Sequence, residues 1–373
     1  MKLIKIICIM TILLFWIVPC DAEEANHQTL RQKARQAYSD GNWKDAYDLY
    51  RKLGLEVEND PRSVGADLIQ AWQCLQQLNR LSELDAFREQ VIGRHRNNWR
   101  LLQAAAQSYI QNPHWGHMIA GEFERGEHRG GGKYVNAIQR DRVRALQLMN
   151  EALKLTARES AKSEVAYFYL EFARFFMQYR GYHQAWRLQY LTDLSRLPDY
   201  EPGYGYEYGQ RQMGAPADTL NRPILHHIPE SFEAAETDGE RWRYLQTAAV
   251  QLDHRLESRV IYEFASFLHQ QFGVQTLREY GNFFFGRRAR SEEDIQKDSS
   301  GPYEIHTLGD DETIAKLAVG VRRFSLPPGF NYIKLLDGVV QKPDGGYAHY
   351  ATRLLAQIYE NRRQYDRAAE YWH

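Results

Sequence analysis

Three long stretches of this chain contain no proline, and that absence most limits the folds open to it. The proline-free stretches are residues 62–112, 114–197 and 230–301. Because proline breaks the hydrogen-bond ladder of a helix interior, these stretches leave room for long helices. Apolar residues within them recur at steps of three and four, as in Leu146, Met149 and Leu153, and no sustained two-residue alternation is visible. The sequence therefore predicts an all-α fold.

The helices are predicted to come in pairs that share one kind of turn. In the clearest pair, Asp40 and Gly41 end the first helix. A small residue lets two helices approach closely, and an aromatic residue three before an alanine fills the space beside the turn. The residues that we expect to pack in this way are Ala34, Trp43 and Ala46 in residues 34–53, Ala173, Tyr182 and Ala185 in residues 172–191, and Ala356, Tyr365 and Ala368 in residues 355–372. A weaker copy spans residues 68–91.

The small-residue and aromatic pattern of these pairs resembles the tetratricopeptide repeat. Helix pairs of that kind cannot bury their apolar faces alone, and stacking them produces a superhelix with a long concave surface. We therefore expect a tetratricopeptide-like helix-pair superhelix, an α-α solenoid with long loops. The alternative is an irregular helical bundle built from the same pairs.

The first residues have the features of an export signal. Lys2 and Lys5 precede an apolar run over residues 6–18, which is shorter than the roughly 20 residues of a membrane-spanning helix. Pro19 ends the run, and cleavage after Ala22 would release a mature chain into the periplasm or cell envelope. The alternative is a lipoprotein signal with acylated Cys20, which is the only membrane contact that we expect. Plain cleavage leaves Cys74 as a lone buried thiol without a disulfide.

The remaining organisation follows from loops and restarts of the helical pattern. We expect a signal peptide (1–22), helical repeats (23–197), a Tyr/Pro/Gly-rich loop (198–229), a helical segment (230–284), a polar loop (285–311) and a helical segment (312–373). Asp310, Asp311 and Glu312 are the kind of residues that favour the N-terminus of a helix. The last helix pair looks incomplete, so we expect either a partner at that end or further C-terminal domains of the same polypeptide.

Charge and motif searches exclude several functions. The chain has 47 Lys and Arg against 48 Asp and Glu, so it lacks the basic surface that nucleic-acid binding requires. A glycine tract at residues 128–133 fails as a phosphate-binding loop, because Glu127 and Tyr134 stand where glycine and serine or threonine are needed. We expect a simple turn there. Anion binding by His128, Arg129 and Lys133 is the alternative.

No metal, cofactor or catalytic residue is predicted. His114 and His117 lie too close to Pro113 and Gly116 to share a helical turn, and the chain has neither an H-E-x-x-H motif nor a cysteine pair. It also lacks the G-x-S-x-G turn of the α/β-hydrolases.

A tyrosine-rich loop supplies the main alternative function. Tyr200, Tyr204, Tyr206 and Tyr208 could stack on sugar rings, and the carboxylates beside them could serve a glycosidase. On that reading the chain is an α-helical carbohydrate-active enzyme or glycan-binding module, with Tyr204 and Tyr206 as ligand residues. The simpler interpretation is that the tyrosines cover exposed helix ends.

Several segments together resemble the N-terminal region of large exported bacterial alpha-2-macroglobulin-like proteins. The segments are residues 97–109, 121–149, 181–201, 226–243, 271–277, 310–336 and 359–372. The resemblance implies a helical-repeat region that precedes β-sandwich domains of a protease trap. The family's bait segment and Cys-Gly-Glu-Gln thioester are missing, since Cys74 is followed by Leu-Gln-Gln. We therefore expect a non-catalytic, exported protein-interaction module with an unidentified protein partner.

Overall fold

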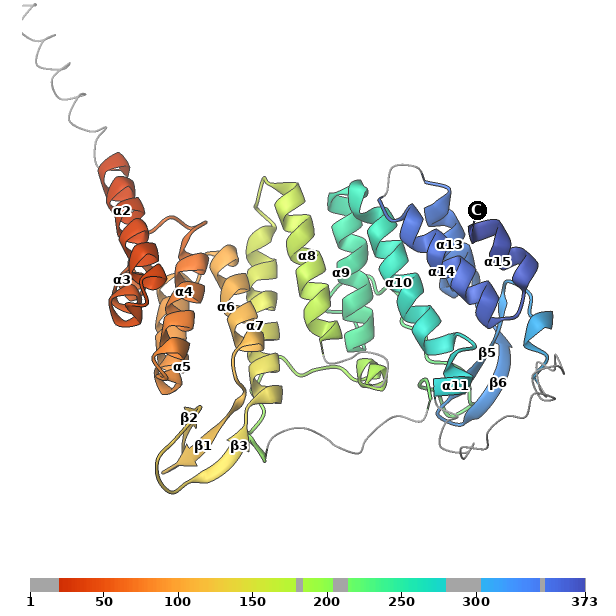
Figure 1. Ribbon diagram of the computed structural model, residues 1–373, viewed down its shortest axis with the longest axis horizontal. Coiled ribbons are helices and arrows are strands. Elements are labelled where there is room, and N and C mark those ends of the chain that lie inside the picture. Colours follow the sequence, from red (N-terminus) through yellow and green to blue (C-terminus); the bar gives the residue numbers. More distant parts are fainter. Residues whose placement is uncertain (1–19, 179–183, 204–213, 280–302, 343–345, 373) are drawn as a thin grey trace, which may run out of the picture. The chain divides into compact units, whose positions relative to one another are not determined.

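The computed structural model describes residues 20–178, 184–203, 214–279, 303–342 and 346–372. Most of these residues lie in helices (Figure 1), so the prediction of a mainly helical fold is confirmed. Two small antiparallel sheets are also present, which the all-α prediction did not include. The chain divides into two compact units. The first contains residues 1–159 and 193–206, and the second contains residues 160–192 and 207–373.

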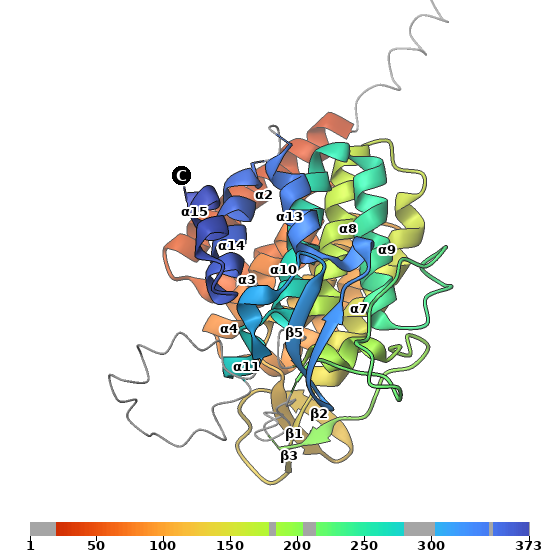
Figure 2. The same cartoon turned by 90° about the vertical axis from the view of Figure 1, so that its right-hand side faces the viewer.

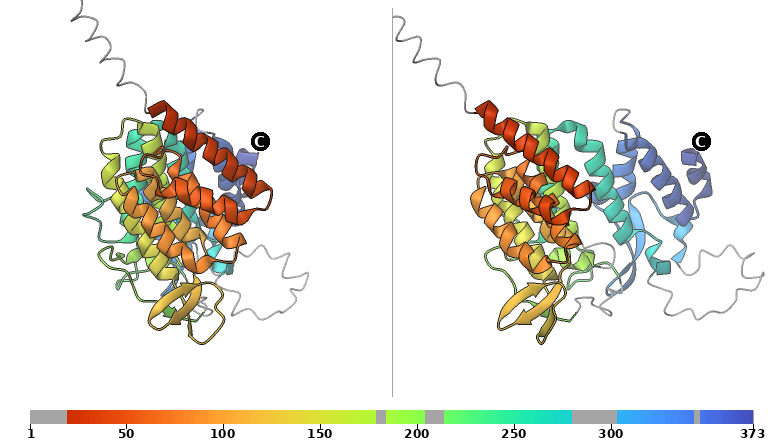
Figure 3. Two further views of the ribbon diagram at one scale, coloured as in Figure 1. Left: turned by 90° about the vertical axis from the view of Figure 1, so that its left-hand side faces the viewer. Right: turned by 60° about the vertical axis from the view of Figure 1, so that its left-hand side comes forward.

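The first unit consists of neighbouring helices with a small sheet at one end (Figure 3). Its elements are α2 (Cys20–Ser39), α3 (Trp43–Leu55), α4 (Val64–Gln77), η1 (Leu81–Glu83), α5 (Leu84–Arg94), α6 (Trp99–Gln111), β1 (Trp115–Ile119), β2 (Glu122–Arg125), β3 (Lys133–Asn136), α7 (Ile138–Thr156) and β4 (Glu201–Pro202). Helix α3 packs on α2 and α4, and α6 packs on α7. A buried ion pair, in which Arg31 Nη2 lies 3.0 Å from Asp67 Oδ2, joins α2 to α4.

The second unit combines antiparallel helices with one hairpin. Its elements are α8 (Lys162–Met177), η2 (Ala185–Gln189), α9 (Asp238–Leu252), η3 (His254–Leu256), α10 (Glu257–Phe272), α11 (Thr276–Glu279), η5 (Ile305–Thr307), β5 (Glu312–Leu317), β6 (Gly320–Ser325), η6 (Pro328–Phe330), α13 (Tyr332–Val340), α14 (Ala348–Asn361) and α15 (Tyr365–Trp372). Helix α8 packs on α9, α13 packs on α10 and α14, and α14 packs on α15.

Three helix pairs share the same turn. Each turn has one residue in the left-handed region, namely Gly41 (φ 77°), Asn79 (φ 56°) and Arg363 (φ 58°). The backbone N–H of the next residue reaches back to close the turn: Asn42 to Ala37 O (2.8 Å), Arg80 to Leu75 O (2.9 Å) and Gln364 to Tyr359 O (2.9 Å). This is the bond pattern of a Schellman motif, which satisfies the last carbonyls of a helix and reverses the chain.

The three turns also have buried residues at the same distances along the sequence from the left-handed residue. Seven residues before the left-handed residue lie Ala34, Trp72 and Ala356, and five residues after it lie Ala46, Leu84 and Ala368, all at most 7% exposed. Trp43 is half-buried and contacts Tyr38 edge-on, with ring centroids 4.8 Å apart. Tyr365 is 62% exposed, so our prediction that it fills the space beside the last turn is wrong.

The predicted pair at residues 172–191 is not a pair of α-helices. Ala173 and Ala185 are both buried, but Ala185 lies in the short 3₁₀-helix η2, and Tyr182 lies outside the described residues. The N-terminus of α9 explains why η2 does not continue as a helix beyond Gln189. Asp238 N donates to Tyr190 O, and Thr192 N donates to Asp238 Oδ1. These bonds hold residues 190–192 in a non-helical path, and α8 packs on α9 instead.

The helix expected after the acidic residues at 310–312 is also wrong. Residues 312–325 form the hairpin β5–β6, with Glu312 opposite Ser325 and Leu317 opposite Gly320. The two-residue turn requires Gly320, whose φ of 138° suits only glycine. Strand β5 is buried on both faces, with Thr313, Ile314 and Ala315 at most 2% exposed. It therefore lacks the polar–apolar alternation by which a strand is recognised.

A buried arginine joins this hairpin to α14. Arg362, fully buried, donates to Gly309 O (3.0 Å), Glu312 O (2.8 Å) and the Tyr332 hydroxyl (2.9 Å). Two of its acceptors are therefore backbone carbonyls of the segment that begins the hairpin.

Among the described residues, no helix is both long and apolar enough to cross a membrane. Residues 1–19 of the predicted signal peptide (1–22) lie outside those residues.

The left-handed conformation of Gly41 predicts that a larger residue there lowers the stability of the chain. Gly41→Ala should lower the free energy of unfolding by about 1 kcal/mol, because an added Cβ is strained in the left-handed region. Gly93→Ala is the matched control. Gly93 lies in α5 with open space around it, so alanine should stabilise the chain by up to about 1 kcal/mol. Urea unfolding measures both, and equal effects would contradict the assignment of the turn.

Candidate functional site

Residues 115–136, which fall within the predicted helical repeats, contain the strands β1, β2 and β3 (Figure 1). With β4 they form a sheet of strand order β2-β1-β3-β4. Gly116 in β1 faces Arg125 in β2 and Val135 in β3. A Cβ at this position would lie 2.2 Å from Glu124 O, so only glycine allows the strands to pair this closely. The sheet places Arg125, at the end of β2, against the helices of the first unit.

Arg125 is the centre of a buried charge network. Its Nη1 and Nη2 donate to the two carboxylate oxygens of Asp141 on α7 (2.8 and 2.9 Å), and its Nε donates to Asp85 Oδ2 on α5 (3.1 Å). Its Nη1 also donates to Pro113 O (2.6 Å), and His114 Nδ1 lies 2.8 Å from Asp141 Oδ2. One guanidinium thus joins the sheet to two helices and to the loop before β1.

The network keeps its groups charged. Burial alone would raise the pKa of Asp141, but hydrogen bonds from His114 and Arg125 outweigh burial and hold that pKa below its ordinary value. Burial also opposes the charge of Arg125, yet Asp141 and Asp85 raise its pKa. Glu89 behaves like Asp141, because bonds from Arg144 and Tyr109 overcome the effect of burial and lower its pKa.

A cavity of about 340 Å³ adjoins this network within the first unit. Its lining residues are Asp85, Glu89, Tyr109, Arg125, Arg140, Asp141, Arg144, Leu197 and Tyr200. Arg144 donates to both carboxylate oxygens of Glu89 (2.9 and 2.8 Å), and the Tyr109 hydroxyl donates to Glu89 Oε1. The carboxylates at the cavity wall are therefore each held by an arginine.

Tyr200, the one member of the predicted tyrosine cluster among the described residues, lines the cavity. Its ring stacks on Phe123, with centroids 4.4 Å apart and planes at 20°. The guanidinium of Arg140 lies 4.7 Å from the centroid of the same ring and donates to Pro198 O (2.8 Å). Tyr200 is thus engaged by two neighbours of its own unit. Tyr204 and Tyr206 lie outside the described residues.

His128, Arg129 and Lys133 do not line this cavity. His128 Nδ1 lies 3.1 Å from Glu124 Oε2, while the side chains of Arg129 and Lys133 are exposed near the turn between β2 and β3. Gly130 and Gly132 in that turn have positive φ values of 150° and 143°. Within the described part of the chain, no group of three or more His, Cys, Asp or Glu side chains is placed to hold a metal ion.

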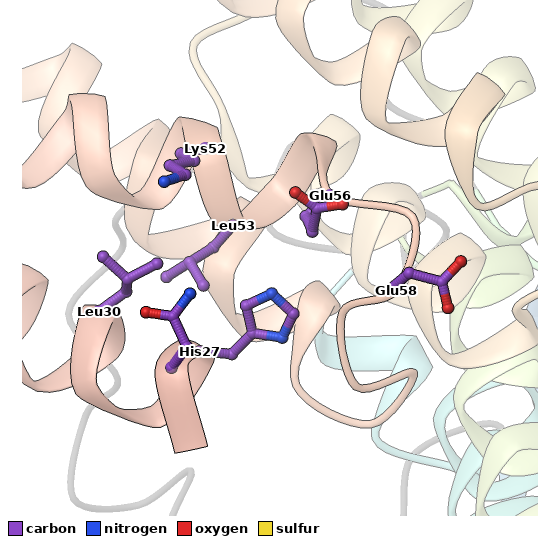
Figure 4. Close-up of a pocket in the computed structure, with 7 residues that line it drawn as sticks. His27, Leu30, Lys52, Leu53, Glu56 and Glu58 are labelled. Carbon is purple, nitrogen blue, oxygen red and sulfur yellow. The ribbon is translucent and has the colours of Figure 1, made fainter. Parts of the chain in front are cut away.

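A smaller cavity of about 170 Å³ lies where α2 meets the end of α3 (Figure 4). It is lined by Asn26, His27, Leu30, Lys52, Leu53, Glu56 and Glu58. Its mixed charges and small size suit ordered water better than a larger ligand.

Cys74 is a buried thiol in α4. Burial raises its pKa to about 11, so the nucleophilic thiolate is scarce at neutral pH.

Comparison with known proteins adds no assignment. No protein-family model matches this chain, and no curated protein is significantly similar to it.

The charge network predicts a large cost for removing one of its members. Asp141→Asn should lower the free energy of unfolding by about 3 kcal/mol, because it leaves Arg125 buried with less compensation. Urea unfolding followed by tryptophan fluorescence measures the change. Asp48→Asn, at an exposed position on α3, is the matched control and should change stability by less than about 0.5 kcal/mol. Similar effects of the two variants would contradict a structural role for the network.

The network also predicts a pH dependence. The folded-state pKa values of Asp141 and Glu89 are lowered, whereas unfolded Asp and Glu titrate near about 3.9 and 4.3. The stabilisation is therefore complete above the unfolded values and is lost as pH falls through the folded ones. Unfolding measured between neutral and acid pH should show this loss, and Asp141→Asn should make it smaller. An unchanged dependence in that variant would contradict the assignment.

Proposed function

We propose that this chain is a non-catalytic helical-repeat module that binds protein. The observation that carries the proposal is the turn shared by three helix pairs, with the left-handed residue at Gly41, Asn79 and Arg363. Buried residues at corresponding positions before and after each turn add to it. One local structure that recurs in separate parts of a chain is typical of repeat proteins, and it supports the tetratricopeptide-like interpretation. Such arrays serve mainly to present surface.

The chemistry of the larger cavity supports the absence of catalysis. A general acid or base works best with a pKa near the operating pH. Asp141 and Glu89 have pKa values lowered by arginine, and the pKa of Tyr109 is raised by burial. The pKa values of these three groups are thus shifted further from neutral pH rather than toward it. The ion pairs favour a structural role for the cavity wall.

The glycan-binding alternative has less support. A sugar-stacking tyrosine needs a free ring face, and the ring of Tyr200 already contacts Phe123 and Arg140. This arrangement is what a tyrosine that covers neighbouring structure would adopt.

Export to the periplasm or cell envelope, with Cys20 as a lipid anchor in the alternative form, belongs to the same proposal and rests on the sequence of residues 1–22. The resemblance to the leading region of alpha-2-macroglobulin-like proteins is also part of this proposal. It would make further domains of the same polypeptide one class of partner.

Site-specific photo-crosslinking in the native cell tests the proposed function. A benzophenone amino acid would replace Tyr167 on α8 or Tyr365 on α15, both more than half exposed. We expect a discrete protein adduct from at least one helix position, because a repeat module binds through its helix faces. Arg129, exposed in the turn between β2 and β3, is the control position.

Two results would contradict the proposal. One is the absence of adducts from both helix positions. The other is sustained hydrolysis of polysaccharide or peptide substrates by the purified chain.

A further inference from the structure

Among the described residues, one edge of the second unit's hairpin is covered and the other is open. The covered edge belongs to β5. Lys316 N donates to the Thr276 hydroxyl oxygen (3.0 Å), Ala215 N donates to Lys316 O (2.8 Å), and Arg362 donates to Glu312 O (2.8 Å). Figure 2 shows β5 and β6 together with the neighbouring α11. These contacts use the outward-pointing groups of β5, so any further strand would have to add to β6.

The same contacts fix which groups of β6 point outward. Lys316 bonds away from the hairpin, so it and its partner Val321 form a non-hydrogen-bonded pair. Because antiparallel pairs alternate, the pairs that contain Arg323 and Ser325 are of the same kind. The N–H and C=O groups of Val321, Arg323 and Ser325 therefore point away from β5, and no described residue bonds to them. Such an edge is a template for another strand.

The charges on β6 favour one kind of added strand over another. Arg322 and Arg323 are exposed on neighbouring positions. Arg323 is paired with Glu312 across the hairpin, at 2.6 Å, whereas Arg322 has no ion-pair partner in the described part of the chain. A second copy of β6 would bring like charges together, which destabilises cross-strand pairs. An acidic strand would place a carboxylate beside Arg322 instead.

We infer that the open edge of β6 binds an extended acidic segment of a partner protein as an added strand. Main-chain hydrogen bonds to residues 321, 323 and 325 would supply affinity, and Arg322 would select acidic residues. The inference rests on the proposed protein-binding function and names the chemistry of one partner. It concerns the hairpin and not the helix faces that the crosslinking experiment probes, so either experiment can fail without the other.

Fluorescence anisotropy with the whole mature chain tests the inference. The probe is a labelled peptide of sequence Thr-Glu-Val-Glu-Thr-Glu-Val with blocked ends, and the matched probe has lysine at each glutamate. We expect the acidic peptide to bind about tenfold or more tightly than the lysine peptide, since the sign of every cross-strand pair with Arg322 is reversed. Hydrogen exchange should slow at the amides of residues 321, 323 and 325 when the acidic peptide is present.

Two pairs of variants locate the binding. Ser325→Pro removes one outward N–H and should weaken binding roughly fivefold, while Ser325→Ala keeps that N–H and should bind normally. Arg322→Glu should also weaken binding roughly fivefold, whereas Arg353→Glu reverses an exposed charge on α14 and should have no effect. Circular dichroism confirms that each variant is folded.

Three outcomes would overturn the inference. In the first, the acidic and lysine peptides bind equally or not at all. In the second, Ser325→Pro and Ser325→Ala bind the acidic peptide equally. In the third, hydrogen exchange at residues 321–325 slows as the protein concentration rises in the absence of peptide. The last result would mean that the edge pairs with a second copy of the chain.

Discussion

The first unit depends on one buried guanidinium. Arg125 at the end of β2 binds Asp141 on α7 and Asp85 on α5, so the sheet and two helices share one set of hydrogen bonds. Burying charge costs free energy unless every donor finds an acceptor at the right distance and angle. The network therefore permits one arrangement of these three elements. Arg31 with Asp67 acts in the same way between α2 and α4, at the start of the unit.

Much of the fold could be predicted because helices and their turns are local. Gly41 marks a turn that needs a left-handed residue, and the alanines at 34 and 46 mark where two helices approach. The failures have non-local causes. Residues 190–192 leave the helical path because Asp238, far along the chain, binds their backbone. Strand β5 gave no alternating pattern because both its faces are buried.

The candidate site was harder to predict than the fold. Its charged residues lie on α5, β2 and α7, and nothing in their spacing indicates that they meet. Arg125 was not among the predicted site residues, because a strand of four residues has too few positions to show a period. The weak signal was Asp141 among apolar residues on the inner face of a helix. A charge at such a position needs a partner, but the sequence does not name it. Tyr200 was found, although its ring covers its neighbours and is not open to a sugar.

The way in which Arg362 holds the hairpin has an evolutionary consequence. Its acceptors at Gly309 and Glu312 are backbone carbonyls, which every amino acid possesses. Substitutions along the hairpin can therefore change its side chains without removing the bonds that fix its position on α14. The exposed positions of the hairpin can diverge in sequence while its place in the fold is kept. The surface charge at exposed positions such as Arg322 can thus change with little loss of stability.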